Sequence, residues 1–206
     1  KKLIVNDQKL KLIVNNKNYG HLRSPVHGIL QSKGEATILI NSDFQDPPEL
    51  IVQLIAKWDQ GQKIVLLQKK NSEENKMYFF LRKLFYKTLN NLSDTKLTLN
   101  TTGSGIFDKS IIDELRKIID PCPYFRGLVA DLGPKIQLIE FDQPKRKLGK
   151  TKNNFFSLLD TAILGFVKHS KWPLRFMTIF GSIISLFSIL IAIIFFFSIL
   201  LFWNSF

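Results

Sequence analysis

Two carboxylates and an amide follow the apolar run at residues 36–40, in the segment Asn-Ser-Asp-Phe-Gln-Asp-Pro-Pro-Glu that begins at Asn41. Asp43 and Asp46 are three residues apart, and Gln45 lies between them. Carboxylate and amide oxygens are the ligands that hard cations such as Mg²⁺ and Mn²⁺ prefer, together with substrate phosphate oxygens. The alternative is that Asp46 only caps a helix and that Asp43 is an ordinary loop acid. Asp43 is the better ligand candidate, because the capping role already occupies Asp46.

A basic segment is the second candidate for chemistry. Between Lys145 and Lys152, five of eight residues are Lys or Arg, and Gly149 and Thr151 are interspersed among them. Such a loop suits a diphosphate, because Arg binds phosphate with a bidentate fork and Lys binds it as a point charge. A solvated basic loop beside an anionic membrane is an equally good interpretation. Nucleic-acid binding ranks third, because no aromatic side chain lies between the cations.

The composition divides the 206 residues into a charged part and an apolar part. The formal net charge is +12, yet 45% of the residues are hydrophobic. That hydrophobic fraction excludes a disordered chain. The single cysteine, Cys122, excludes a disulfide scaffold, and with three histidines it leaves no Cys/His zinc site. Residues 176–206 contain no charged side chain, so the entire net charge belongs to the first 175 residues.

The apolar stretch at residues 176–203 is long enough to cross a membrane. An uncharged run of more than about 18 apolar residues is typical of a transmembrane helix. Lys168, Lys171 and Arg175 precede the run. Positive residues beside a span favour the cytoplasmic side. We therefore expect a cytoplasmic domain followed by a C-terminal transmembrane helix.

Strands and helices are predicted to alternate in the part that carries the candidate residues. In α/β sheets of this kind, ligands bind beyond the carboxyl ends of the strands, which directs attention to the residues after 40, 67 and 141. The predicted class is therefore α/β with a mainly parallel sheet. The expected strands lie at 10–14, 36–40, 63–67 and 135–141, and the expected helices at 24–34 (N-cap Ser24, N1 Pro25), 47–60 (N-cap Asp46), 75–92, 108–119 (N-cap Asp108) and 124–132.

The segment from Asn41 to Glu49 resembles the Asp-x-Asp-x-Gln-Asp-Pro-Pro-Glu motif of family 2 glycosyltransferases, which have the GT-A fold. The group that it resembles most transfers sugars to polyprenyl phosphates and includes dolichyl-phosphate mannose synthases and bacterial undecaprenyl-phosphate sugar transferases. Further matching segments follow in family order and span essentially the whole chain, at 18–25, 85–93, 100–108, 124–128 and 146–152. The resemblance implies a Rossmann-like GT-A domain at 1–152, a juxtamembrane helix and linker at 153–175, and a transmembrane helix at 176–203.

The resemblance also implies a reaction, in which a membrane-bound inverting enzyme moves a sugar from a nucleotide sugar to a polyprenyl phosphate with the help of Mg²⁺ or Mn²⁺. The implied partners are this donor, the lipid acceptor and the membrane, with no nucleic acid; a homo-oligomer and a bacterial inner membrane are also expected. The implied site residues are Asp43 and Gln45 for the metal, Lys69, Arg146 and Lys152 for donor or acceptor phosphate, and Asn41, His21 and Arg23 as further donor-site candidates.

Three departures from the family pattern qualify this expectation. Asn41 replaces the first Asp of the metal motif and removes one charge. Gly103, followed by Ser104, occupies the position where many relatives carry an Asp that is a candidate base, so no catalytic base is named. The family's first strand would precede residue 1 and a second span would follow residue 206, so we expect a piece of a longer protein. The alternative function is a truncated or degenerate non-catalytic relative that acts as a membrane-anchored binding or partner subunit.

Overall fold

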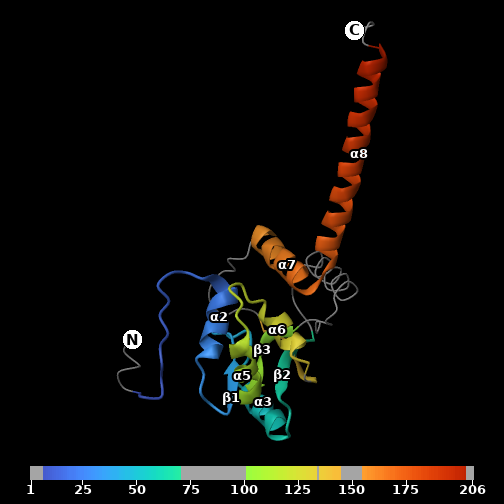
Figure 1. The fold of residues 1–206 in the computed structure, drawn as a ribbon. Coiled ribbons are helices and arrows are strands. Elements are labelled where there is room, and N and C mark those ends of the chain that lie inside the picture. Colours follow the sequence, from blue (N-terminus) through green and yellow to red (C-terminus); the bar gives the residue numbers. More distant parts are fainter. Residues whose placement is uncertain (1–6, 71–100, 134, 145–154, 203–206) are drawn as a thin grey trace.

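A computed structural model describes residues 7–70, 101–133, 135–144 and 155–202 (Figure 1). Helices pack on a single sheet, and a long C-terminal helix projects away from this domain. The elements in chain order are α2 (Gly20–Leu30), β1 (Ala36–Leu39), α3 (Leu50–Asp59), β2 (Ile64–Lys69), β3 (Thr101–Asp108), α5 (Lys109–Lys117), α6 (Phe125–Asp131), β4 (Ile136–Phe141), α7 (Phe155–His169) and α8 (Trp172–Phe202).

The four described strands form a mixed sheet in the order β1-β3-β2-β4. Only β2 and β4 pair in parallel; β3 runs antiparallel to both of its neighbours. The α/β class is confirmed. The expected shared direction is found in β1, β2 and β4, which run the same way. Because the reversed strand β3 lies between β1 and β2, only one neighbouring pair is parallel. The strand β3 was not predicted, because its first half reads Thr-Thr-Gly-Ser-Gly and has no apolar periodicity.

Both faces of the sheet are buried, and the strand β2 supplies residues to each of them. Ile64 and Leu66 face a core formed with α2, α5 and α6, whereas Val65 and Leu67 face a core formed with α3. Strands covered on both faces have continuous apolar sequences, and this explains why 63–67 was correctly predicted as a strand. The edge strand β1 is only partly buried along its length, but Leu39 packs against the first of these cores, and Ala36 and Ile38 pack against the second.

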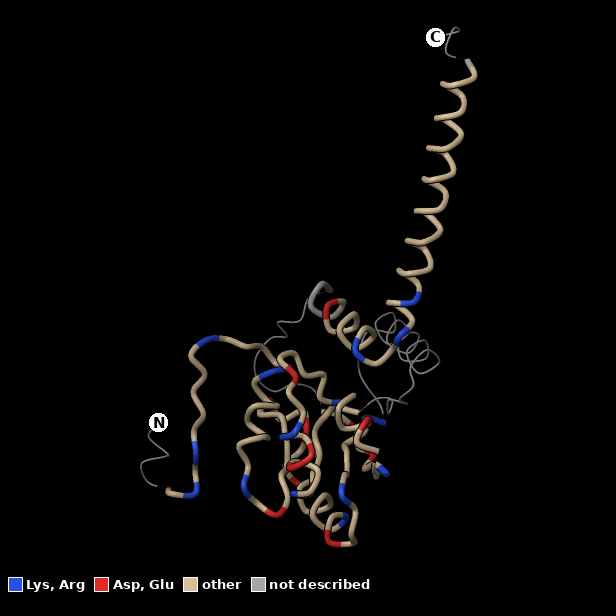
Figure 2. Tube along the Cα trace, viewed as in Figure 1, with Lys and Arg blue, Asp and Glu red and all other residues tan. Residues whose placement is uncertain are grey.

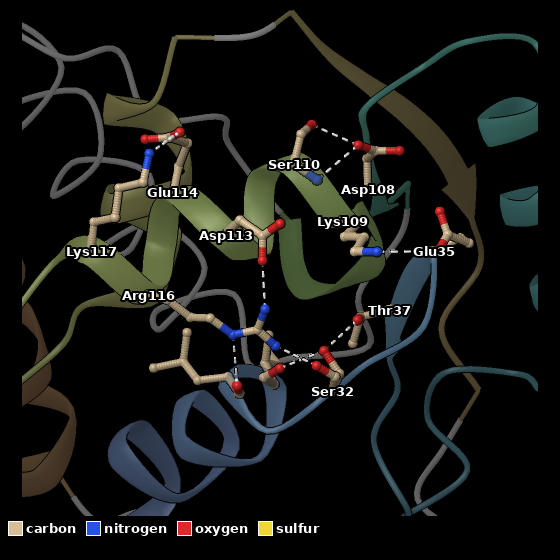
Figure 3. Close-up of polar contacts among 12 residues, drawn as sticks. Ser32, Glu35, Thr37, Asp108, Lys109, Ser110, Asp113, Glu114, Arg116 and Lys117 are labelled. Carbon is tan, nitrogen blue, oxygen red and sulfur yellow. Dashed lines mark hydrogen bonds and ion pairs between the residues drawn. The ribbon is translucent and has the colours of Figure 1, made fainter.

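The turn from β3 into α5 is capped as the sequence indicates. The Asp108 carboxylate accepts hydrogen bonds from the backbone N–H of Ser110 (2.9 Å) and from the indole N–H of Trp58 (2.9 Å). Burial alone would raise the pKa of Asp108, but these hydrogen bonds outweigh it and lower the pKa. Figure 3 shows this cap. The helix begins where the carboxylate satisfies one of its free N–H groups, that of Ser110.

One arginine of α5 closes the end of α2. The Arg116 guanidinium donates to the backbone carbonyls of Leu30 (3.0 Å) and Ser32, and it pairs with Asp113 (Figure 3). These carbonyls belong to the last turn of α2 and to the residues after it, where no intrahelical N–H is available. The two helices on this face of the sheet are therefore joined by a side chain as well as by apolar packing.

Two predictions near the N-terminus were wrong. Residues 10–14 are exposed and irregular, because no strand among the described residues pairs with them. The helix α2 begins at Gly20 instead of at Pro25, since the Asn18 side chain accepts the Gly20 N–H (2.8 Å) and turns the chain earlier. The Ser24 hydroxyl accepts from the side chain of Asn15 instead of capping a helix.

The remaining predicted helices had mixed outcomes. The helix predicted from 47 begins at Leu50 and has no side-chain cap, so Asp46 is not its N-cap. The helices expected near 108–119 and 124–132 are present as α5 and α6. The one expected at 75–92 lies outside the described residues.

The helix α8 is long and apolar enough to cross a membrane. Within residues 172–201, the most apolar 18-residue stretch has a mean hydropathy of 3.0 and is not buried against the protein. Figure 2 shows that basic residues lie at the base of this helix and that no charged residue follows along the rest of it. The hydroxyls of Thr178, Ser182 and Ser188 donate to carbonyls one turn earlier, so they need no partner outside the helix.

The end of α7 is fixed to the α6 region by one ion pair, one histidine–carboxylate contact and close packing. The Lys168 ammonium lies 2.6 Å from the Asp120 carboxylate. The buried His169 imidazole lies 3.3 Å from the Asp131 carboxylate. Burial alone would raise the pKa of Asp120, but the Lys168 hydrogen bond leads the interactions that lower it. The His169 ring occupies the space where a Cβ at Gly127 would be. Because α8 follows α7 directly, this junction connects the domain to the candidate span.

We predict that Gly105→Ala destabilises the domain. A Cβ at this position would meet the backbone carbonyl of Val65 on the neighbouring strand, which cannot move away as a flexible side chain could. The expected cost is about 1–3 kcal/mol, which lowers the melting temperature by roughly 2–4 °C per kcal/mol. Gly28→Ala is the matched control, because a Cβ there has open space inside α2. Equal melting temperatures for the two variants would contradict the tight β2–β3 contact.

We also predict that the folded state becomes less stable as pH falls through about 6.5. Burial lowers the pKa of His169 despite the opposing effect of Asp131, so the folded protein takes up this proton at lower pH than the unfolded chain, whose value is near 6.5. Below that pH, protonation therefore favours the unfolded chain and lowers the free energy of unfolding. Above it, the imidazole is neutral in both states, so His169 adds no pH dependence. Urea unfolding between pH 5 and pH 8 measures this dependence. His169→Gln should flatten it, and an unchanged slope in that variant would assign it to other groups.

Candidate active site

The candidate site lies where β1 and β2 end and β3 begins. Leu39, at the end of β1, pairs with Gly105, and Gln68, near the end of β2, pairs with Thr101. Because β3 runs in the opposite direction, its first residues lie at the same edge of the sheet as the carboxyl ends of its two neighbours. The loop at 41–46 and the segment at 101–104 therefore meet, although about sixty residues separate them.

Asp43 and Gln45 are held in a tight turn. An Asp43 carboxylate oxygen accepts the backbone N–H of Gln45 at 3.1 Å. Phe44 between them has a φ of 58°, in the left-handed region that few residues other than glycine adopt. Such backbone conformations persist where the surrounding structure holds them, and they concentrate at functional sites.

Asp46 is the buried member of this loop. Its side chain is 1% exposed, and Oδ2 accepts hydrogen bonds from Asn41 Nδ2 (2.6 Å) and Ser104 Oγ (2.6 Å). Asp46 therefore joins the loop to β3, which explains why it does not cap α3. Its Oδ1 has no hydrogen-bond partner among the described residues.

Arg126 and Gly103 extend the site from β3 toward α6. Gly103 has a φ of +85°, and a Cβ there would lie 3.4 Å from Arg126 Nε. The Arg126 guanidinium donates to the Thr102 carbonyl at 3.0 Å. A cation thus lies beside Gly103, the position where the resemblance expects the candidate base of many relatives. Neither Arg126 nor Ser104 was among the predicted site residues, although both lie in segments that match the family pattern.

The other predicted residues are distributed as follows. Lys69 lies at the end of β2, at the same edge as the loop, where it pairs with Phe141 of β4. His21 and Arg23 are exposed on α2, and Arg23 donates to Cys122 Sγ at 2.5 Å. The structure therefore joins Arg23 to the segment before α6. Arg146 and Lys152 lie outside the described residues.

The oxygen chemistry of the loop suits a hard cation. Asp43 offers a partly exposed carboxylate, while Gln45 and Asn41 offer amide oxygens. In the described parts of the chain, no group of three or more His, Cys, Asp and Glu side chains lies together. A Mg²⁺ or Mn²⁺ site with few protein carboxylates is completed by substrate phosphates and water, so these residues fit such an ion.

Comparison with known proteins identifies the family of this domain. Residues 1–116 match the family described as Glycosyl transferase family 2. The chain belongs to glycosyltransferase family 2. This confirms the family expected from the segment 41–49, and places the loop, β1, β2 and β3 inside the matched region.

Several curated relatives resemble this family-2 chain along most of its length. An uncharacterized glycosyltransferase of Synechocystis sp. is 32% identical over 90% of this chain. One of Bacillus subtilis is 30% identical over 87% of it, and a bactoprenol glucosyl transferase of Shigella phage SfX is 26% identical over 91%. The chain spans 59%, 56% and 62% of these three relatives, respectively.

Proposed function

We propose that this chain is part of a membrane-bound inverting glycosyltransferase that moves a sugar from a nucleotide sugar to a polyprenyl phosphate. The observation that carries the proposal is the loop of Asp43 and Gln45 at the carboxyl edge of a family-2 sheet. The candidate span supports a lipid acceptor, because the greasy tail of a polyprenol remains in the bilayer. Relatives named bactoprenol glucosyl transferase support the same acceptor class.

In this proposal Asp43 and Gln45 hold a divalent cation, Mg²⁺ or Mn²⁺. When bound, such an ion would neutralise negative charge on the nucleotide diphosphate as it leaves. Asn41, beside them, together with His21 and Arg23, completes the candidate donor site. The turn between Asp43 and Gln45 would keep these oxygens in place before substrate binds, which lowers the cost of ordering them.

The cations of the chain would handle the phosphates. Lys69 lies at the edge of the sheet, and Arg146 and Lys152 belong to the basic segment after β4; each would bind donor or acceptor phosphate. The acceptor phosphate is already anionic, so its oxygen can attack the sugar C1 while the bond from C1 to the diphosphate breaks. Attack opposite the leaving group inverts the configuration at C1. No protein base is required to remove a proton in this step.

The membrane orientation follows from the charges beside the span. Lys168, Lys171 and Arg175 lie at the base of α8 and favour the cytoplasmic side. We therefore place the domain in the cytoplasm at a bacterial inner membrane, with a domain at 1–152, a juxtamembrane region at 153–175 and a span at 176–203. A homo-oligomer and the absence of a nucleic-acid partner belong to the same proposal.

Asp43→Asn tests the metal role directly. The substitution keeps the side-chain shape but removes the negative charge of the one carboxylate that the proposal places against the cation. Sugar transfer to polyprenyl phosphate should fall by at least about 100-fold, because a metal's charge stabilisation is worth several kcal/mol. Asp59→Asn, an exposed acid at the end of α3, is the control for lost charge. Unchanged turnover in Asp43→Asn would exclude the metal role. If neither the wild type nor the variants transfer sugar from any donor, the alternative of a non-catalytic partner subunit is favoured.

Arg146→Ala tests the basic segment. The Michaelis constant for the phosphorylated substrate that it contacts should rise about 10-fold or more, since a charge-assisted hydrogen bond is lost. Lys135→Ala, an exposed cation just before β4, controls for the change in net charge. A lower melting temperature with normal kinetics in the remaining folded enzyme would assign the segment a structural role instead.

A further inference from the structure

The helix α7 exposes a row of large apolar side chains, which we call the α7 stripe. Leu159, Ile163 and Val167 are 42%, 51% and 59% exposed, respectively. They are spaced four residues apart, so they lie one above the other on a single face of the helix. A single exposed apolar residue is ordinary on a protein surface, whereas a contiguous row of them marks an interaction surface.

The opposite face of α7 is packed against the domain. Gly165 is buried, and a Cβ at this position would lie 3.2 Å from the Tyr124 ring. The ring centroids of Tyr124 and His169 are 5.5 Å apart. Because each residue turns the helix by about 100°, Gly165 and His169 lie roughly 120–160° around it from Ile163. The packing that joins α7 to the domain therefore directs the stripe away from the domain.

The stripe lies next to the candidate span but does not belong to it. The chain turns between α7 and α8 at Ser170, whose hydroxyl accepts the Trp172 N–H at 3.2 Å. Figure 1 shows that α7 is inclined to α8 and lies at the end of the domain from which α8 projects. A helix with one apolar face and one packed face, beside a span, has the character of an interfacial helix.

The residues around the turn suit the headgroup region of a bilayer. Residues 159–175 carry three Lys or Arg side chains and one acid, Asp160. Lys171 and Arg175 are exposed, and cations at such a position are attracted to anionic lipids. Trp172, between them, is 48% exposed, and Trp is enriched at the membrane–water interface. These side chains favour a lipid surface over a second protein as the partner of the stripe.

We propose that α7 lies on the bilayer surface and inserts Leu159, Ile163 and Val167 below the lipid headgroups. Contact with lipid removes from water the apolar surface that the domain leaves exposed. The other face of α7, with Gly165 and His169, then holds the domain in a fixed orientation to the membrane. The inference does not depend on sugar transfer, but it rests on the part of the proposed function in which α8 crosses the membrane.

Spin labels distinguish lipid, water and protein as the surroundings of the stripe. In the full chain in lipid nanodiscs, the single cysteine is first removed by Cys122→Ser. Leu159→Cys, Ile163→Cys and Val167→Cys then each provide one labelling site. Electron paramagnetic resonance measures collision of the label with oxygen, which concentrates in lipid, and with a water-soluble nickel chelate. We expect high oxygen accessibility at the stripe, and chelate accessibility at least about 5-fold below that of an aqueous site, because polar solutes are excluded from acyl chains.

Two reference positions supply the aqueous and the lipid values. Val52→Cys is the matched aqueous control, because this apolar side chain is 72% exposed on α3, at the end of the domain away from α8 (Figure 1). Ile184→Cys lies within the candidate span and supplies the lipid value. Each variant should melt within about 1 °C of the Cys122→Ser protein, as surface substitutions do, which shows that the fold is kept.

The two reagents give outcomes that separate this inference from the proposed function. Chelate accessibility at the stripe equal to that at Val52→Cys, with Ile184→Cys in lipid, would overturn the inference alone. Low accessibility of the stripe to both reagents would also overturn it, because the stripe would then contact protein, such as a second copy of the chain. Chelate access to Ile184→Cys would show that α8 is not a span, and the membrane attachment of the proposed function would fail together with the inference.

Discussion

A single buried carboxylate connects the loop after β1 to the start of β3. Asp46 accepts from Asn41 within its own loop and from Ser104 on the neighbouring strand, and it is almost completely withdrawn from solvent. The conformation of the loop that carries the candidate metal ligands is therefore set by contacts with the neighbouring strand as well as by its own residues. Its position follows from the register of β1 and β3, in which Leu39 lies opposite Gly105. Pairing of the strands and burial of one acid thus determine where Asp43 presents its oxygens.

Much of the architecture could be predicted from local patterns. The continuous apolar sequence of β2 and the capping residue Asp108 correctly indicated a strand and a helix start. By contrast, β3 could not be predicted from periodicity, because Gly103 and Gly105 are present for tertiary reasons: one adopts a positive φ, and the other passes close to the carbonyl of Val65.

The site shows the same division between local and long-range information. The oxygen-rich segment 41–49 was visible in the sequence, but the role of Asp46 was not. Capping is a local rule, and here a bond to Ser104, 58 residues away, outcompetes it. Similarly, Arg126 becomes a site neighbour only because α6 packs beside the start of β3.

The domain and the apolar helix are directly connected, and both bear on the function. A family-2 sheet carries candidate metal ligands at its carboxyl edge. The helix α7, fixed to the α6 region through Lys168 and His169, leads directly into α8. The most direct test of sugar transfer to a membrane lipid uses membranes that contain the full-length protein, polyprenyl phosphate and a panel of radiolabelled nucleotide sugars. Our account predicts that label from one donor enters the organic phase, that chelation by EDTA stops this transfer and that added Mn²⁺ or Mg²⁺ restores it. Absence of lipid-linked label with every donor, in membranes where the folded protein is present, would contradict it.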